Sequence, residues 1–150
     1  MKKAIWLVIA GLLIAALVWV LYPTEQRKLK SEIGSLRRAV ERESTDEVIK
    51  RIDPAYEDAH GLTHAGLVPV IEQFFAGVDS INVQMSGLKV TIDSVGRDKT
   101  IFASCSLGVR LLARFEGERV LAFGGIVRPG TVRAWFHKTG PEYLIYRAEY

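Results

Sequence analysis

The spacing of apolar residues changes after Gly77, and this change constrains the fold more than any other feature of the sequence. Before Gly77, apolar residues recur every three or four positions, as in an amphipathic helix. After Gly77 they alternate with polar residues, as in a half-buried strand. Helices followed by a series of strands predict an α+β domain, in which about three helices pack on one face of a bent antiparallel sheet.

Two of the predicted helices begin with recognisable cap signals. The first covers residues 25–43, with Thr24 as its N-cap. Ser44 and Glu47 form a capping-box pattern at the start of a short second helix, which ends before Pro54. The narrow apolar stripe of the first helix predicts that it packs against its own domain.

A third helix is predicted in THAGLVPVIEQFFAGV, with Thr63 as its N-cap. Pro69 lies inside this pattern and would remove a backbone hydrogen bond if it lay beyond the first turn. A start closer to Val68 is therefore the alternative.

The sheet is predicted from segments with alternating apolar residues, separated by the turn signals EGE, RPG and KTGPE. Short connections between consecutive strands predict antiparallel hairpins. Gly124 and Gly125 interrupt one strand pattern and predict a bulge or a sharp bend. The predicted strand segments are LKVTIDSV, TIFASCSLGVRLLARF, RVLAFGGIV, TVRAWFHK and YLIYRAEY.

An apolar segment precedes this domain. No residue from Ala4 to Tyr22 is charged, and a helix of that length measures about 28 Å, close to the hydrocarbon core of a bilayer. The exit from the segment, LVWVLYPTE, has bulky residues where a signal peptidase requires small ones. We therefore expect residues 1–23 to form an uncleaved signal-anchor with one transmembrane helix, and residues 24–150 to form the domain.

Basic residues on both sides of the segment bear on its orientation. Lys2 and Lys3 favour a cytoplasmic amino terminus, although several basic residues also follow the span. The expected location is the cell inner membrane, as a single-pass protein with its domain on the extracytoplasmic (periplasmic) side. The opposite orientation is the alternative.

Charge and motif content argue against several functional classes. The chain has 20 basic and 17 acidic residues, and without Lys2 and Lys3 the balance is 18 against 17, a net charge of +1. No run of basic residues is interleaved with aromatic ones, so nucleic-acid binding is not expected. No phosphate-binding glycine loop or nucleophile elbow is present, and no cofactor is expected. The single cysteine, Cys105, excludes an internal disulfide and lies in an apolar alternation typical of a core residue.

The segment YEDAHGLTHAG holds two histidines behind two carboxylates. A zinc site needs three or four ligands, and Gly61 and the cap at Thr63 place His60 in a loop rather than on one helix with His64, so no metal site is expected. Two interpretations remain. Either this is a polar loop that leads into a helix, or it lies at a pocket mouth, with Asp58 as base or binding group and His60 or His64 as its proton partner.

The two leading helices are followed by IDPAYEDAHG, and then by a third helix that runs into INVQMSGLKVTIDSV. The chain ends in the predicted hairpin TVRAWFHKTGPEYLIYRAEY. This order of elements, over about residues 25–150, resembles the nuclear transport factor 2-like superfamily, which includes ketosteroid isomerase-like and polyketide cyclase-like proteins. The resemblance implies a cone-shaped domain with a pocket between the concave sheet face and the helices.

The resemblance also bears on chemistry. In the isomerase-like members a carboxylate after the second helix acts as general base, and Asp58 matches that position. A helix-borne tyrosine that helps to hold their oxyanion has no counterpart, because no Tyr or Trp occurs between Pro23 and Ala55. This departure counts against isomerase chemistry.

Two functional hypotheses follow. In the first, the domain is a non-enzymatic interaction or assembly module, which holds a protein partner or a second copy of itself at the membrane through the sheet face around Trp135. In the second, it binds a small apolar ligand, or is a pocket enzyme of the ketosteroid isomerase-like type, and uses Asp58 with His60 or His64. The second hypothesis predicts a deep, partly apolar cavity, one of those side chains pointing inward, and a raised carboxylate pKa. The candidate ligand- or partner-binding residues are Tyr56, Trp135, His137 and Tyr146.

Overall fold

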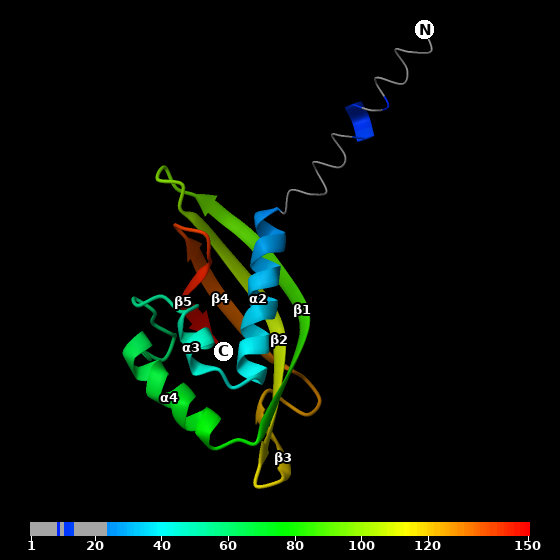
Figure 1. The fold of residues 1–150 in the computed structure, drawn as a ribbon, viewed down its shortest axis with the longest axis vertical. Helices are drawn as coiled ribbons and strands as arrows, with labels where there is room; N and C mark the ends of the chain where they lie inside the picture. Colours follow the sequence, from blue (N-terminus) through cyan, green and yellow to red (C-terminus); the bar gives the residue numbers. More distant parts are fainter. Residues whose placement is uncertain (1–8, 10, 14–23) are drawn as a thin grey trace.

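The computed structural model describes residues 9, 11–13 and 24–150 of the chain. Residues 24–150 form helices followed by strands, so the predicted α+β class is confirmed (Figure 1). The helices are α2 (Glu25–Glu41), α3 (Thr45–Ile49) and α4 (His64–Ala76). The strands are β1 (Ser80–Val95), β2 (Ile101–Phe115), β3 (Glu118–Phe123), β4 (Gly130–Lys138) and β5 (Leu144–Glu149).

The membrane span predicted for residues 1–23 lies, apart from residues 9 and 11–13, outside the described part of the chain. Among the described residues, no helix is both long enough and apolar enough to cross a membrane. The signal-anchor therefore stays a prediction from the sequence.

β2 is the central strand of the sheet, and all pairings between the named strands are antiparallel. On one side β2 pairs with β1. On the other side its residues 101–109 pair with β4, and its residues 111–115 pair with β3. β5 continues the sheet beyond β4, which gives the order β1-β2-β4-β5, with β3 beside the distal part of β2.

Irregular pairing bends the long hairpin of β1 and β2. The register shifts between Ser86 and Lys89, where Gly87 has a φ of +62°, and shifts again between Ile92 and Ser94. Each shift inserts one extra residue in β1, which increases the local twist and bends the strand. The sheet thereby curves around α2, which packs along β1 (Figure 1).

The main core lies between α2, α3 and the concave face of the sheet. Alternate residues of β2 and β4 face the helices, because successive side chains of a strand point to opposite faces. Leu29 on α2 is fully buried and packs in the same core as Phe136 of β4. Among the described residues, the buried members of this core lie between Leu29 and Ile145, so residues 24–150 supply a core of their own. That segment can therefore be expected to fold without residues 1–23.

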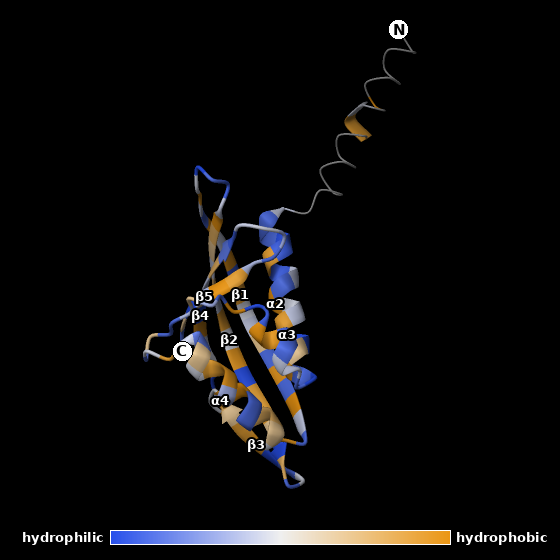
Figure 2. Ribbon diagram, turned by 60° about the vertical axis from the view of Figure 1, so that its left-hand side comes forward, coloured by the Kyte–Doolittle hydropathy of each residue, from blue (hydrophilic) through white to orange (hydrophobic). Residues whose placement is uncertain are grey.

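α4 differs from α2 in composition and in burial. Its sequence, HAGLVPVIEQFFA, is mostly apolar, and Figure 2 shows it mainly in the hydrophobic colours, whereas α2 is mainly hydrophilic. Even so, none of the residues of α4 is buried, and Val70 is 52% exposed. α4 therefore packs against the core only through half-buried side chains, such as Leu67, Ile71 and Phe75.

The alternative start of the third helix near Val68 is wrong. α4 begins at His64, and Pro69 lies inside it. Pro69 lacks the N–H that would bond to the carbonyl of Ala65, four residues earlier. Ala65 is exposed, so water can satisfy its carbonyl and the helix continues through the proline.

The cap predictions have different outcomes. Thr24 is the N-cap of α2, and its hydroxyl accepts the N–H of Arg27 at 3.4 Å, as predicted. Ser44 is the N-cap of α3, but its side chain makes no cap hydrogen bond, so the predicted capping box is not formed. Glu47 forms an ion pair with Arg42 instead, which draws its carboxylate away from the cap.

Residues 51–59 cover the outer edge of β5. The N–H of Ile145 donates to the carbonyl of Arg51 at 2.9 Å, and the N–H of Asp53 donates to the carbonyl of Ile145 at 2.8 Å. The N–H groups further along the segment donate to carbonyls of β5 in the same way. This attachment places the YEDAHG stretch beside the sheet.

Candidate functional site

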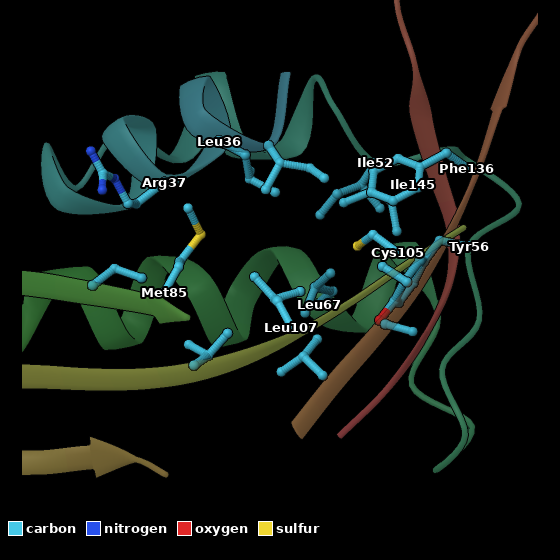
Figure 3. A pocket seen from close by; sticks show the side chains of 16 residues that line it. Leu36, Arg37, Ile52, Tyr56, Leu67, Met85, Cys105, Leu107, Phe136 and Ile145 are labelled. Carbon is cyan, nitrogen blue, oxygen red and sulfur yellow. The ribbon is translucent and has the colours of Figure 1, made fainter. Parts of the chain in front are cut away.

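Two adjoining cavities lie between the helices and the concave face of the sheet. The α2 cavity, whose lining includes Leu36 and Arg37 of α2, has a volume of about 220 Å³ and is shown in Figure 3. The α4 cavity, whose lining includes Val70 and Phe74 of α4, has a volume of about 530 Å³ and is more open to solvent. Both cavities are lined by Tyr56, Leu67, Val83, Val109 and Val132.

Almost every side chain that lines the two cavities is apolar. The exceptions are Arg37, Tyr56, Cys105 and Tyr150. The Cys105 side chain points into the α2 cavity (Figure 3), and burial raises the pKa of its thiol to about 11. The thiol is therefore protonated at neutral pH and acts as a small apolar group, as its sequence context predicted.

Tyr56 lies at the junction of the two cavities. Its side chain is buried, and its hydroxyl makes no hydrogen bond to another of the described residues. Burial, together with the nearby Asp58 carboxylate, raises the pKa of Tyr56 to about 12, so the hydroxyl stays neutral. It is a positioned polar group, able to donate or accept a hydrogen bond within an otherwise apolar space.

Asp58, predicted as a base or binding group, is only 6% exposed and lines neither cavity. Its Oδ1 accepts the N–H groups of His60 and Leu62, each at 2.8 Å, and its Oδ2 accepts the Tyr150 hydroxyl at 2.5 Å. Burial alone would raise the pKa of this carboxyl group, but the three hydrogen bonds outweigh burial and lower it. This direction is opposite to the one expected of a pocket base. The carboxylate holds the loop and the last residue of the chain together.

Neither of the predicted proton partners lines a cavity. His60 is exposed in the loop, and its ring centroid lies 5.2 Å from that of Tyr150. His64 is the first residue of α4 and is half-buried. Within the residues that the structure describes, no group of three His, Cys, Asp or Glu side chains is placed to hold a metal ion.

Three of the four candidate binding residues gather on the outer face of the sheet, away from the cavities. The ring of Tyr146 lies between that of His137, at 5.9 Å, and that of Phe102, at 6.4 Å. Trp135 lies on the same face, with the Arg147 guanidinium 5.2 Å from its ring centroid. The fourth candidate is the inner tyrosine described above. The four residues thus belong to two separate sites.

His137 also contacts Asp53, which the sequence patterns did not single out. The Nε2 atom of His137 lies 2.5 Å from Oδ2 of Asp53. Burial would raise the pKa of Asp53, but the N–H of Ala55 and the His137 ring lower it. The contact joins the 51–59 segment to β4 across 84 positions of sequence, a separation at which no local motif could reveal it.

Arg37 and Tyr150 are the other site residues that the sequence did not single out. In the helical pattern, Leu36 was identifiable as a core residue, whereas nothing separates Arg37 from the other charged residues of α2. Tyr150 is the last residue, and only the fold brings it to Asp58.

Comparisons with known proteins identify the fold. No protein-family model matches the sequence, and no curated protein matches it. A solved structure of a protein assigned as a scytalone dehydratase, from Novosphingobium aromaticivorans, is 14% identical, with a TM-score of 0.62 over 83% of this chain and 81% of its own. A protein assigned as a dehydratase of the nuclear transport factor 2-like family, from Streptomyces avermitilis, is 11% identical, with a TM-score of 0.62 over 83% of this chain and 92% of its own.

Two longer proteins contain the same fold. The helical cell shape determining protein Pgp2 from Campylobacter jejuni, solved as a mutant, is 7% identical with a TM-score of 0.64 over 81% of this chain. Bd1075 from Bdellovibrio bacteriovorus is 13% identical with a TM-score of 0.59 over 81% of this chain. The chain spans 39% and 38% of the length of these two proteins. At these identities the likeness shows the fold alone, and that fold is nuclear transport factor 2-like, as the resemblance implied.

Proposed function

We propose that the domain binds a small, mainly apolar ligand in the α2 and α4 cavities and does not itself carry out acid–base chemistry. The observation that carries this proposal is the pair of adjoining cavities, of about 220 and 530 Å³, with an almost wholly apolar lining. Small-molecule sites are typically concave, apolar and of this size, with a few polar groups that orient the ligand. The Tyr56 hydroxyl is such a group.

The titratable groups around the cavities support binding over catalysis. A general acid or base works best with a pKa near the working pH. Burial raises the pKa of Tyr56 to about 12 and that of Cys105 to about 11, and the hydrogen bond to Asp58 raises that of Tyr150 to about 12. Asp58 has a lowered pKa and lines neither cavity. An enzyme that uses Asp58 with a histidine therefore has weaker support than a binding protein.

The proposal includes a membrane tether. The uncharged segment from Ala4 to Tyr22 is long enough to span a bilayer, and α2 begins shortly after it, at Glu25. We propose the extracytoplasmic side for the domain, because a short basic amino terminus favours the cytoplasm. Such a tether would hold the cavities close to a source of apolar molecules.

Two substitutions on β4 test the binding proposal. Val132 lines both cavities, whereas Trp135 lies on the outer face. We expect Val132→Phe to fill the shared space and to abolish binding of Nile red, a neutral apolar dye, in fluorescence titrations of residues 24–150 and of the full chain in nanodiscs. Trp135→Ala should leave the affinity unchanged. Circular dichroism and urea unfolding check that both variants fold. Wild-type dye affinity in a folded Val132→Phe variant would contradict the proposal.

A second function is supported by the aromatic residues of the outer face. Phe102 is 38% exposed beside Tyr146, and Trp135 lies on the same face. We propose this face as the contact for a protein partner or a second copy of the chain, which is the interaction role expected from the sequence. Trp135→Ala would then weaken association of the full chain in mild detergent, measured by sedimentation or by recovery of a stoichiometric partner. Association equal to that of wild type would exclude this face.

A further inference from the structure

We infer that the ligand of the α2 cavity is an amphiphile with an anionic head group, and that Arg37 binds this group at the cavity mouth. The inference rests on the proposed function, because it requires an apolar molecule in the cavity. It adds the chemical class of the ligand and a residue that recognises its head group.

Arg37 is the charged residue of the site. Of the described side chains that line either cavity, it alone carries a charge at neutral pH. Figure 3 places it beyond Met85, at the opposite end of the α2 cavity from Tyr56. Between them lie apolar side chains from α2, α4 and the sheet, such as Leu67 and Leu107. A molecule that follows this path would have an apolar body and a polar group at the Arg37 end.

The guanidinium of Arg37 has no strong partner among the described residues. Its Nε is buried and makes no hydrogen bond. Its ion-pair partner is Glu41, whose Oε2 lies 3.8 Å from Nε, which exceeds hydrogen-bond distance. The other oxygen of Glu41 accepts the N–H of Val83 on β1 at 3.1 Å, so this carboxylate is held by the strand. In contrast, Lys138 and Arg147 each lie within 2.9 Å of a carboxylate.

The position of Arg37 suits a head group at a mouth. Its side chain is 39% exposed, so the stem can line the cavity while the terminal nitrogens reach solvent. A guanidinium presents its N–H groups as a fork that fits two oxygens of a carboxylate or a phosphate. A neutral apolar molecule could occupy the cavity without engaging this fork, whereas an anionic amphiphile would engage both the cavity and the fork.

The test compares three ligands with the same ten-carbon chain: decanoate, decyl phosphate and decanol. Isothermal titration calorimetry on residues 24–150 should show that at least one of the two anions binds about tenfold more tightly than decanol, as expected for one charge-assisted hydrogen bond. The comparison of decanoate with decyl phosphate shows which head group is preferred. Arg37→Gln should weaken binding of the preferred anion to the level of decanol and leave decanol unchanged.

Arg38→Gln is the matched control. Arg38 is the next residue on α2, is exposed, donates to Ser35 and lines neither cavity. It carries the same charge, so a general electrostatic effect would appear in both variants, and a head-group site only in Arg37→Gln. Equal binding of all three ligands by wild type, or an equal loss of anion affinity in both variants, would overturn this inference and leave the proposed function in place. Failure of all three ligands to bind, together with failure of Nile red, would instead refute the proposed function.

Discussion

The carboxylate of Asp58 shows how one residue can match a catalytic position and yet be engaged structurally. It follows the second helix, as the general base of isomerase-like proteins does, but three hydrogen-bond donors surround it. Two of these donors are backbone N–H groups of its own loop, and local sequence was consistent with such a loop. The third, Tyr150, is 92 positions away, and only the folded sheet brings it there. The sequence could therefore suggest the loop, but not the ionised state of the carboxylate.

Substitution of Asp58 should affect stability and not ligand binding. Asp58→Asn removes the charge that accepts three hydrogen bonds, and we expect the free energy of unfolding to fall by about 1–3 kcal/mol at pH 7. Because the folded-state pKa is lowered, this stabilisation is present above the unfolded pKa and is lost as the pH falls through the folded value, so the difference between the two proteins should shrink below about pH 4. Urea unfolding as a function of pH measures it. A stable variant that has lost Nile red binding would assign Asp58 to the ligand site.

At the scale of the elements, β1 explains why one strand was predicted too short. The alternation in LKVTIDSV predicted a strand that starts at Leu88, but β1 begins at Ser80. Ile81 and Val83 occupy odd positions, whereas Leu88 and Val90 occupy even ones, because the bulge near Gly87 inserts one residue. A bulge switches the core-facing residues of a strand from odd-numbered to even-numbered positions. A search for strict alternation therefore detects the strand on only one side of the bulge.

The end of β3 is a second departure. RVLAFGGIV predicted a strand pattern that continues past its glycines, but β3 stops at Phe123, and Gly124 has a φ of +84°. Ile126 and Val127 then project into solvent with 86% and 89% exposure. The glycine pair did predict a sharp bend. The bend leaves an exposed apolar tip at Ile126 and Val127. Arg110 holds this loop, because it donates to the carbonyl of Ile126 at 2.9 Å.

The loose packing of α4 should appear in its dynamics. Its residues are at most half-buried, so opening it exposes less apolar surface per residue than opening α2, which has three buried residues, and local stability follows such burial. We expect amide hydrogens of α4 to exchange faster than those of α2 and β2 when peptides are followed by mass spectrometry. Saturation with Nile red should slow exchange in α4, because the ligand would fill the space under Val70 and Phe74. Protection of α4 equal to that of β2 without ligand would contradict this account.

At the scale of the whole molecule, the fold class and the approximate order of elements were predictable from the change of hydrophobic period. The two cavities could not be predicted from that change. Their lining combines side chains of α4, such as Leu67 and Phe74, with side chains of the sheet, whereas the sequence shows only that α4 is apolar. The resemblance to nuclear transport factor 2-like proteins implied a pocket, while the residues that give it polarity, Arg37 and Tyr56, come from separate elements.

The start of α2 is joined to the far end of the sheet through Glu25, and this link bears on the acid stability of the whole domain. Its carboxylate accepts from Lys28, from Lys138 at 2.9 Å and from Tyr143 at 2.8 Å. Burial would raise the pKa of Glu25, but these donors lower it to about 2. The residue thus stabilises the folded domain wherever it is ionised.

Glu25→Gln should lower the free energy of unfolding by about 1 kcal/mol at neutral pH, a modest value because the side chain is 29% exposed. Because the folded-state pKa is lowered, this contribution is fully present at pH values above the unfolded pKa of 4.5. It should disappear as the pH falls toward the folded-state pKa of about 2. Thermal unfolding from pH 7 to pH 2 gives the comparison, with Glu72→Gln on α4 as the control, since Glu72 is exposed. A constant difference at all pH values would show that the charge of Glu25 is not the cause.

The edges of the two outer strands of the sheet also affect whether such domains aggregate when many of them are crowded together. Residues 51–59 occupy the free side of β5, and the bulges of β1, with Glu41 bonded to the N–H of Val83, interrupt the other side. An uninterrupted edge would invite a neighbouring chain to add a strand, which is a common beginning of fibrous aggregation. Chains tethered to a membrane, as proposed above, would collide often. Blocked edges would let them reach a high local density and remain separate, folded molecules.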